Sequence, residues 1–237
     1  MSDVVSSISL ANLSLAFIPV VFVVYILFKW SLQAGNAIYA LARMLSQLLL
    51  VGYFLAYIFA SDSAWIVFGI ISIMVFASSW IALDTVKDKR LVLYKQSLLS
   101  IAIGGGVVFL IVILVVLELD KWYFPKYSIP IAGMIFANSM TSVSLAAERL
   151  ASEISRGVDY VNARRVALQT ALIPVINSLF AVGLVSLPGM MTGQILSGVS
   201  PLIAARYQIM VMAMIFASSG ISTIMFLLFA EKSITER

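Results

Sequence analysis

The chain has 237 residues, of which 62% are hydrophobic and 11% are charged, and its mean hydropathy is +1.07. Soluble domains are about half apolar and about a quarter charged, so this composition excludes a soluble globular protein and indicates an integral membrane protein. The sequence contains no Cys and no His. Disulfides and thiolate metal sites are therefore excluded, and so are the commonest general base and the commonest metal ligand.

Seven apolar runs are long enough to cross a bilayer, which takes about 20 residues of helix. They cover residues 8–28, 38–60, 64–83, 98–118, 129–147, 168–187 and 205–230. We therefore expect an all-α integral membrane protein with seven transmembrane helices in a single domain, residues 1–237. Residues 1–7 hold no Lys or Arg, which argues against a cleavable signal peptide.

The basic residues predict the orientation of these helices, because Lys and Arg are enriched in cytoplasmic segments. With the N-terminus outside, twelve of the fifteen basic residues fall inside: Lys29, Arg43, Lys87, Lys89, Arg90, Lys95, Arg149, Arg156, Arg164, Arg165, Lys232 and Arg237. Lys121, Lys126 and Arg206 fall outside. We therefore expect the N-terminus outside and the C-terminus inside. The basic residues occur in short blocks between apolar runs, which is typical of membrane orientation rather than of nucleic-acid binding.

The longest polar stretch, "ERLASEISRGVDYVNARRVALQT" at residues 148–170, predicts a cytoplasmic helical hairpin between helices five and six. Gly157 provides the turn, and Asp159 is the expected N-cap of the second helix. Leu150, Ile154, Val158 and Val161 share one helical face. This apolar stripe is either a docking surface for a cytoplasmic partner or a face that packs on the chain's own "DTVKDKRLVLYKQ" loop.

Two prolines and four glycines interrupt the apolar stretch "VGLVSLPGMMTGQILSGVSP" at residues 182–201. Ser200 followed by Pro201 is a typical helix start, so the last span is expected to begin at Pro201. Residues 188–200 then form a short, bent or re-entrant piece. Irregular backbone at membrane depth is tolerated only against protein or a water-filled cavity, so this segment either lines a pathway or is an outer loop without that role.

Polar and sulfur-bearing side chains inside the spans are the remaining candidates for a pathway. Asn138 and Thr141 lie three residues apart on one helical face, and Asn177 lies in the middle of the sixth span. Such groups either line a polar path or join helices by hydrogen bonds. The methionines of the last span are expected to fill gaps, whereas Met190 and Met191 could also act as soft ligands.

Enzymatic chemistry has little support in the sequence. No nucleotide-binding loop of the form G-x-x-x-x-G-K-[ST] occurs, and "GGGV" at residues 104–107 lies in an apolar span without a following Lys, which favours helix packing. Glu118 and Asp120 lie at a predicted outer end, where water reaches them. We therefore do not expect this chain to be an enzyme.

The motifs "SLPGMMTGQILSGVSP" followed by "ARYQIMV", together with "ALIPVIN", "IPIAGMIFANSM" and "QLLLVGY", resemble the FetB family of ABC-transporter permeases. Bacterial members of that family are described as iron exporters, and plant relatives are linked to aluminium tolerance and nucleotide-sugar transport. The resemblance implies the membrane-spanning subunit of an exporter of iron or a related metal ion or chelate, in the cell (inner or plasma) membrane. A stand-alone transporter or channel and a permease for a nucleotide sugar are the alternatives.

The resemblance also implies partners and roles for residues. Two copies of the chain would pair, and a separate soluble ATPase would bind the cytoplasmic side and carry ATP and Mg²⁺, so this chain would hold no cofactor itself. The coupling element would comprise Glu148, Arg149, Glu153, Arg156, Gly157, Asp159, Arg164 and Arg165. The translocation path or gate would comprise Asn138, Met140, Thr141, Asn177, Pro188, Gly189, Met190, Met191, Gly193 and Gln194. No metal ligands are assigned.

Overall fold

The computed structural model describes residues 8–235, and its regular secondary structure is helical. Within this range there is no β-strand, only a single bridge between Val182 and Ser186. The expectation about a signal peptide rests on residues 1–7 and therefore lies outside the described residues, as does Arg237 in the charge count. The chain divides into two compact units, of which the first ends at Ala60 and the second begins at Ser61.

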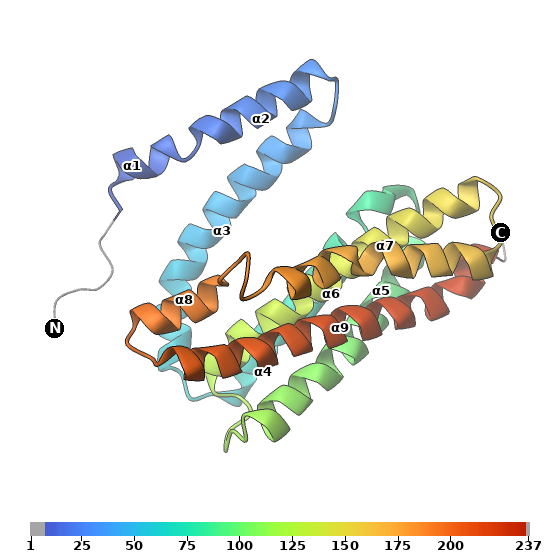
Figure 1. Cartoon of the computed structure of the whole chain (residues 1–237). Helices are drawn as coiled ribbons and strands as arrows, with labels where there is room; N and C mark the ends of the chain where they lie inside the picture. The colour runs from blue at the N-terminus through green and yellow to red at the C-terminus, as the bar shows by residue number, and fades with distance from the viewer. Residues whose placement is uncertain (1–7, 236–237) are drawn as a thin grey trace. The chain divides into compact units, whose positions relative to one another are not determined.

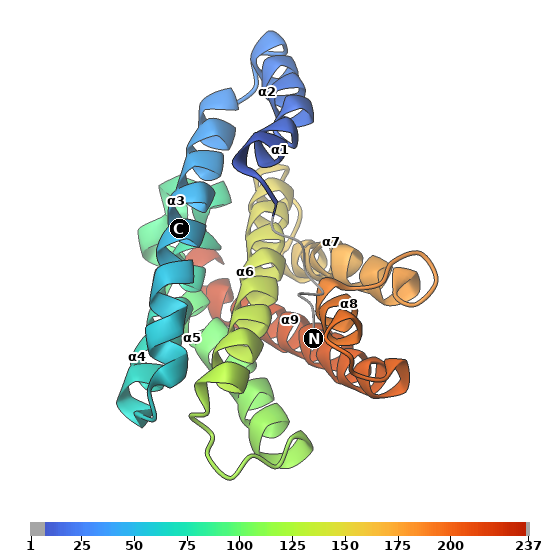
Figure 2. The ribbon, with the colours of Figure 1, turned by 90° about the vertical axis from the view of Figure 1, so that its left-hand side faces the viewer.

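The first unit contains three helices, α1 (Leu10–Leu15), α2 (Ile18–Lys29) and α3 (Ala34–Ala60). The apolar run predicted over residues 8–28 is thus interrupted at residues 16–17, and a proline lies in the first turn of α2. α2 and α3 contact each other in a hairpin (Figure 2). Most of their large apolar side chains are exposed, as expected for helices that face lipid or other protein.

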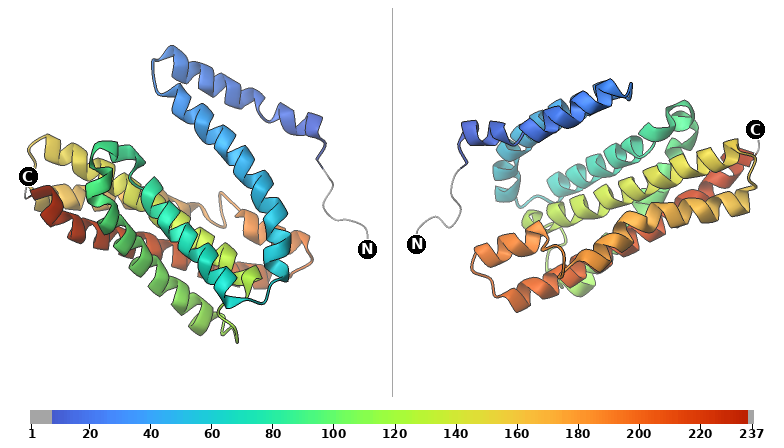
Figure 3. Two further views of the ribbon diagram at one scale, coloured as in Figure 1. Left: turned by 180° about the vertical axis from the view of Figure 1, so that it is seen from behind. Right: turned by 45° about the horizontal axis from the view of Figure 1, so that its top comes forward.

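The second unit is a bundle of long helices. Its elements are α4 (Ala64–Ile81), a 3₁₀ helix (Asp84–Lys89), α5 (Arg90–Leu110) with a π-helical continuation (Ile111–Val116), α6 (Pro125–Ser155), α7 (Tyr160–Ala181), α8 (Gly189–Leu196) and α9 (Pro201–Thr235). α9 packs against α5, α6 and α7, and α6 also packs against α4 (Figures 1 and 3). α6 and α9 are therefore the centre of the bundle.

Local interactions explain where the helices of this unit begin. Asp159 caps α7 by accepting a hydrogen bond from the Asn162 backbone N–H at 3.3 Å, as predicted. The Ser200 hydroxyl accepts from the Ile203 N–H at 3.4 Å, and α9 begins at Pro201, also as predicted. The α6–α7 turn is made at Gly157, whose φ of +83° is readily reached by glycine.

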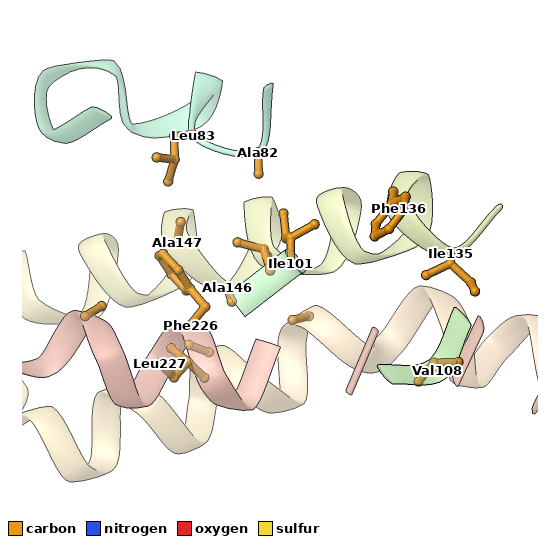
Figure 4. Packing of buried hydrophobic residues seen from close by; sticks show 14 of the residues in the cluster. Ala82, Leu83, Ile101, Val108, Ile135, Phe136, Ala146, Ala147, Phe226 and Leu227 are labelled. Atoms are coloured by element: carbon orange, nitrogen blue, oxygen red, sulfur yellow. The ribbon is translucent and has the colours of Figure 1, made fainter. Parts of the chain in front are cut away.

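The core of the second unit depends on a close approach of α5 and α9. A Cβ atom on Gly104 would lie 2.6 Å from the Ser222 hydroxyl oxygen and 2.8 Å from the Ser222 backbone nitrogen. A Cβ on Gly105 would lie 2.7 Å from the Phe136 ring. The prediction that "GGGV" serves helix packing is confirmed for these two glycines, and Phe136 belongs to the buried cluster in Figure 4.

Buried hydroxyl groups add hydrogen bonds between helices of this bundle. The Ser222 hydroxyl of α9 donates to the Ser139 hydroxyl of α6 at 3.2 Å. The Ser97 hydroxyl of α5 donates to the Ser79 carbonyl of α4 at 3.0 Å. Such contacts join membrane helices that gain little from apolar burial, since lipid is as apolar as the helix surface.

Six helical segments among the described residues are long and apolar enough to cross a membrane: Leu10–Lys29, Ala34–Ala60, Ala64–Ile81, Asp84–Val116, Pro125–Ser155 and Pro201–Ile234. The run expected over residues 168–187 is not among them. α7 instead covers Tyr160–Ala181, because the chain turns at residues 182–186, and its amino-terminal half includes Arg164 and Arg165. The all-helical membrane fold is confirmed, whereas the seventh span and the orientation stay predictions.

The close approach at Gly104 generates a prediction about stability. Replacing Gly104 with Ala should lower the free energy of unfolding by about 1–3 kcal/mol, because the new methyl group meets backbone atoms of Ser222 that cannot easily move. Gly106→Ala is the matched control, since a Cβ there meets nothing within 4 Å. Thermal unfolding of both variants in the same detergent measures the difference, and equal melting temperatures would contradict the packing described here.

Candidate functional site

The interrupted segment between α7 and α9 folds back onto α9. After Ala181 the chain makes a tight turn in which the Gly183 N–H donates to the Ser186 carbonyl at 2.9 Å, with Gly183 at a φ of +84°. Pro188 is extended, α8 follows, and Gly198 at a φ of +90° ends it. The predicted short, bent piece at residues 188–200 is thus one short helix, α8, and the turn that follows it.

A cavity of about 420 Å³ lies between the end of α7, α8 and the first half of α9. Its lining is almost entirely apolar and consists of Leu179, Val182, Gly183, Met191, Ala205, Gln208, Ile209, Met212 and Ala213. Gln208 contributes the only side-chain amide to this lining. We call this space the α8 cavity.

Gln208 is the unusual residue of the α8 cavity. The residue is 5% exposed, and its buried Oε1 atom has no hydrogen-bond partner among residues 8–235. Gln194, on α8, also has a buried Oε1 atom without a partner, although it does not line the cavity. Unpaired buried acceptors are uncommon in folded proteins, so each one requires an explanation.

The structure brings together only part of the predicted path. Met191 lines the α8 cavity, whereas Asn138, Met140, Thr141 and Asn177 do not. The Asn138 amide donates to the Met134 carbonyl at 2.8 Å and the Thr141 hydroxyl to the Ala137 carbonyl at 3.0 Å, both within α6. Asn177 is exposed on α7, and Met140 is partly buried against the core. A pathway role for these four residues stays a prediction.

The rest of the predicted gate lies on or beside α8. Pro188 precedes the helix, and Met190 packs partly against the core. Gly189 and Gly193 are exposed, and a Cβ on either would meet nothing within 4 Å. The face that carries these two glycines is therefore uncovered within the chain.

Two cavity residues were missed or misread from the sequence. Gln208 was not among the expected polar groups, although it falls inside the predicted last span. Met212, 8% exposed, was expected only to fill a gap, and it lines the cavity one helical turn from Gln208. The available signal was their spacing of four residues, which places both on one face of α9.

The segments expected in the cytoplasm meet at one end of the second unit, which we call the basic end (residues 82–90, 148–165 and 231–235). The Thr85 hydroxyl donates to the Ser144 carbonyl at 3.3 Å. The Gln96 amide and the Ser233 hydroxyl lie 2.7 Å apart. These contacts join α5, α6, α9 and the 3₁₀ helix close to that end.

The predicted coupling hairpin forms the centre of the basic end. Glu153 is 7% exposed and forms ion pairs with two arginines. Its Oε1 atom lies 2.6 Å from a guanidinium nitrogen of Arg149 and 3.7 Å from one of Arg156. Arg164 pairs with Glu231 of α9 at 3.7 Å. The two Glu153 pairs are local to the end of α6, and the Arg164–Glu231 pair joins the hairpin to α9. Four residues of the predicted coupling set are therefore engaged in ion pairs within the chain.

Tyr160 ties the beginning of α7 to the end of α9, because its hydroxyl donates to the Leu227 carbonyl. Burial raises the pKa of Tyr160 to about 12, with a further contribution from the nearby Glu231 carboxylate. The phenol therefore remains protonated, and able to donate, throughout the physiological pH range.

The apolar stripe of the hairpin is mostly covered by the chain itself. Leu150 is buried in the core, and Ile154 and Val158 pack partly against it. Val161 remains 42% exposed. Val86 of the 3₁₀ helix packs on the same core, in line with the alternative that the stripe packs within the chain. Besides Val161, the hairpin exposes five residues of the predicted coupling set: Glu148, Arg156, Gly157, Asp159 and Arg165.

The opposite end of the second unit carries a separate ion pair. Lys121 and Asp62 lie 2.7 Å apart, and the hydrogen bond to Asp62 raises the pKa of Lys121. Trp122 and Tyr123 stand beside them with their rings edge to face. Aromatic rings of this kind settle at membrane interfaces.

Metal-binding geometry is not found among residues 8–235, where no group of three or more His, Cys, Asp or Glu could hold an ion. The donors near the α8 cavity are amide oxygens and thioethers. They include no anionic ligand.

Comparison with known proteins decides the family. The model described as "Uncharacterised protein family (UPF0014)" matches residues 10–235. The chain belongs to the UPF0014 family. This confirms the resemblance drawn from the sequence motifs, because the family's relatives include FetB and the plant aluminium-sensitivity protein.

Three UPF0014 relatives cover most of this chain. The UPF0014 membrane protein slr1647 of Synechocystis sp. is 37% identical over 80% of this chain and 79% of its own length. The protein named "Probable iron export permease protein FetB" of Escherichia coli is 34% identical over 90% and 87%. "Protein ALUMINUM SENSITIVE 3" of Arabidopsis thaliana is 33% identical over 80% and 74%. No solved structure matches the chain. The chain is thus a multi-pass membrane protein of the UPF0014 family.

Proposed function

We propose that this chain is the membrane-spanning permease subunit of an ABC transporter that exports iron or a related metal ion or chelate. The observation that carries the proposal is the match to UPF0014 over residues 10–235. A relative whose name specifies iron export aligns with this chain over nearly the whole length of both proteins. ATP and Mg²⁺ would bind a separate ATPase. The absence of a nucleotide-binding loop from the sequence supports this division of labour.

A seven-span topology is part of the proposal, and the packing of α7 supports it. The start of α7 lies beside the end of α9, through Tyr160 and Leu227. The end of α7 lies beside the start of α9, through the cavity shared by Leu179 and Ala205. α7 therefore runs antiparallel to α9, which is long and apolar enough to cross a membrane.

Single cysteines test this topology cleanly because the natural chain contains none. Ser155→Cys and Ser197→Cys place an exposed thiol before and after α7. With seven spans and the N-terminus outside, a membrane-impermeant maleimide should label Ser197→Cys in intact cells and Ser155→Cys only after the cells are opened. Labelling of both in intact cells, or of neither, would contradict the crossing of α7; the Cys-free parent is the blank.

The coupling role of the hairpin rests on its exposed charges. Arg156, Asp159 and Arg165 are exposed at the basic end, while the Arg164–Glu231 ion pair holds the hairpin against α9. A rigid element with an exposed charged face suits a docking site for a soluble ATPase. The proposal includes two copies of this chain in the transporter.

Purification of the tagged chain from native membranes should recover a soluble ATPase that contains a nucleotide-binding loop. Arg165→Gln should weaken that recovery by about tenfold, which corresponds to about 1.4 kcal/mol. Lys126→Gln is the matched control, because Lys126 is an exposed cation at the start of α6, far from the basic end at which α6 finishes. Repeated recovery without any ATPase, from cells that make one, would overturn the proposal in favour of a stand-alone transporter or channel.

The gate is proposed at residues 188–200, which contain α8. Gly189 and Gly193 face open space within the chain, so leucine at either position can be accommodated without internal clashes. Gly189→Leu and Gly193→Leu should therefore insert and fold normally but abolish transport if α8 moves against a second copy or closes the pathway. The assay compares cellular iron content and melting temperature, and normal iron export in both variants would remove the gate from this segment.

A permease for a non-metal solute is the second candidate. The observation that favours it is the α8 cavity, which has an apolar lining and no anionic ligand. ATPase recovery would not separate the two candidates. Stimulation of the recovered ATPase by ferrous iron, compared with stimulation by uncharged solutes, would do so.

A further inference from the structure

We propose that a groove between α4 and α5 holds one acyl chain of an anionic phospholipid, and that Lys95 binds the phosphate of the same lipid. The groove is lined mainly by residues of α4 between Phe68 and Phe76 and by residues of α5 and its π-helical continuation between Leu98 and Leu114. We call it the α4–α5 groove. The inference depends on the membrane class of the protein and on the packing of the second unit, so it stands apart from the ABC function proposed above.

The lining of the α4–α5 groove suits a hydrocarbon chain. The groove has a volume of about 660 Å³, and its lining is almost entirely apolar. Ser72 supplies the only hydroxyl group of the lining, and that hydroxyl already donates to the Phe68 carbonyl at 2.8 Å. A polar ligand would therefore lose its hydration with little in return, whereas a hydrocarbon chain has no hydrogen bonds to lose.

Small residues create the space along α5. Ala102 and Gly106 both line the groove and lie one helical turn apart. A Cβ atom on Gly106 would meet nothing within 4 Å. Larger side chains complete the lining, among them Phe76 and Leu110, which are 53% and 49% exposed. The groove is therefore a furrow of small residues between larger ones, a shape that a single extended chain can enter.

The depth of the groove in a bilayer matches an acyl chain. Its two helices belong to segments that are long and apolar enough to cross a membrane, Ala64–Ile81 and Asp84–Val116. Leu98 and Leu110 lie about 18 Å apart along α5, at about 1.5 Å per residue. One leaflet contributes about half of a hydrocarbon layer that is about 30 Å thick. The groove is thus long enough for the part of an acyl chain that lies within one leaflet.

Lys95 lies on the same face of α5 as the groove. Four residues share this face, at intervals of four, three and four positions: Leu91, Lys95, Leu98 and Ala102. Lys95 is exposed and forms no ion pair among residues 8–235. A cation next to the end of an apolar groove, without an acidic partner in the described chain, is complementary to a lipid that combines a hydrocarbon chain with a negatively charged headgroup.

Aromatic side chains mark the level of Lys95 as a membrane interface. Trp80 follows Phe76 of the groove by one turn of α4 and is 43% exposed. Its ring packs edge to face on Tyr94, the residue before Lys95, with the ring centroids 5.5 Å apart. Trp and Tyr are enriched at membrane interfaces, where their rings lie at headgroup level. The Lys95 ammonium group is therefore placed to reach a lipid phosphate.

The charges around Lys95 favour an anionic headgroup over a zwitterionic one. Residues 84–95 hold four basic side chains and two acidic ones, a net charge of +2: Lys87, Lys89, Arg90 and Lys95 against Asp84 and Asp88. Arg90 pairs with Asp84 and lies over the Trp80 ring, 4.7 Å from its centroid. Basic residues beside a membrane helix attract anionic lipids. Lys95 thus supplies the direct contact, and the surrounding segment supplies a positive potential.

Lipid binding to the purified, delipidated full-length chain in mild detergent tests the inference without any ATPase. The probes are dioleoylphosphatidylglycerol, which is anionic, and dioleoylphosphatidylcholine, which has the same acyl chains and no net charge. Native mass spectrometry counts the bound lipids at each lipid concentration, and phosphatidylglycerol should bind the more tightly. Lys95→Gln should weaken its binding about fivefold, the effect of one lysine near an anionic surface, and leave phosphatidylcholine binding unchanged.

Matched variants separate the headgroup contact from the groove. Arg165→Gln removes an exposed cation of the basic end from α7, which does not line the groove, and should bind phosphatidylglycerol as the parent does. Gly106→Leu places a side chain in the open space of the groove and should weaken the binding of both lipids. Ala102→Phe fills the same groove and replaces Gly106→Leu if that variant does not fold.

Four outcomes would overturn the inference. Equal binding of the two lipids by the parent would remove the selectivity for an anionic headgroup. Phosphatidylglycerol binding that Lys95→Gln leaves unchanged, or that Arg165→Gln weakens as much, would remove Lys95 as a specific contact. Unchanged lipid binding by the folded groove-filling variant would remove the acyl chain from the groove. Displacement of the lipid by excess glycerol 3-phosphate would assign Lys95 to a soluble phosphate instead.

Discussion

The contact on which the second unit depends is the approach of α5 to α9 at Gly104 and Ser222. Backbone atoms of α9 lie so close that no side chain fits on Gly104. In a membrane, apolar burial contributes little to helix association, so close packing and interhelical hydrogen bonds must supply it. The Ser222 hydroxyl, which also bonds to Ser139 of α6, joins three helices at one level of the bundle.

With its middle held in this way, α9 reaches both functional ends of the unit. Its last turns accept the Tyr160 hydrogen bond and the Arg164 ion pair of the hairpin. Its first turns present Gln208 and Met212 to the α8 cavity. α7 follows α9 along the same path in the opposite direction. This antiparallel pair connects the basic end of the second unit with the α8 cavity.

The break between α7 and α9 therefore has a structural purpose that composition alone does not reveal. The prolines and glycines end one helix, allow a tight turn at Gly183 and form a separate short helix, α8. That helix packs against α9 and forms one wall of an apolar cavity. An uncharged ligand suits this cavity better than a bare metal ion. The identity of the transported molecule is therefore the main functional question for this protein.

The sequence by itself determined the membrane class, the turn at Gly157 and the starts of α7 and α9, because each depends on composition or on groups within a few residues. It identified "GGGV" as packing, but it did not show that Gly104 meets Ser222, more than a hundred residues away. The tertiary structure alone decided which helix faces meet. It covered most of the hairpin stripe and placed Gln208 in the lining of a cavity, because these outcomes depend on contacts between distant segments that no local pattern encodes.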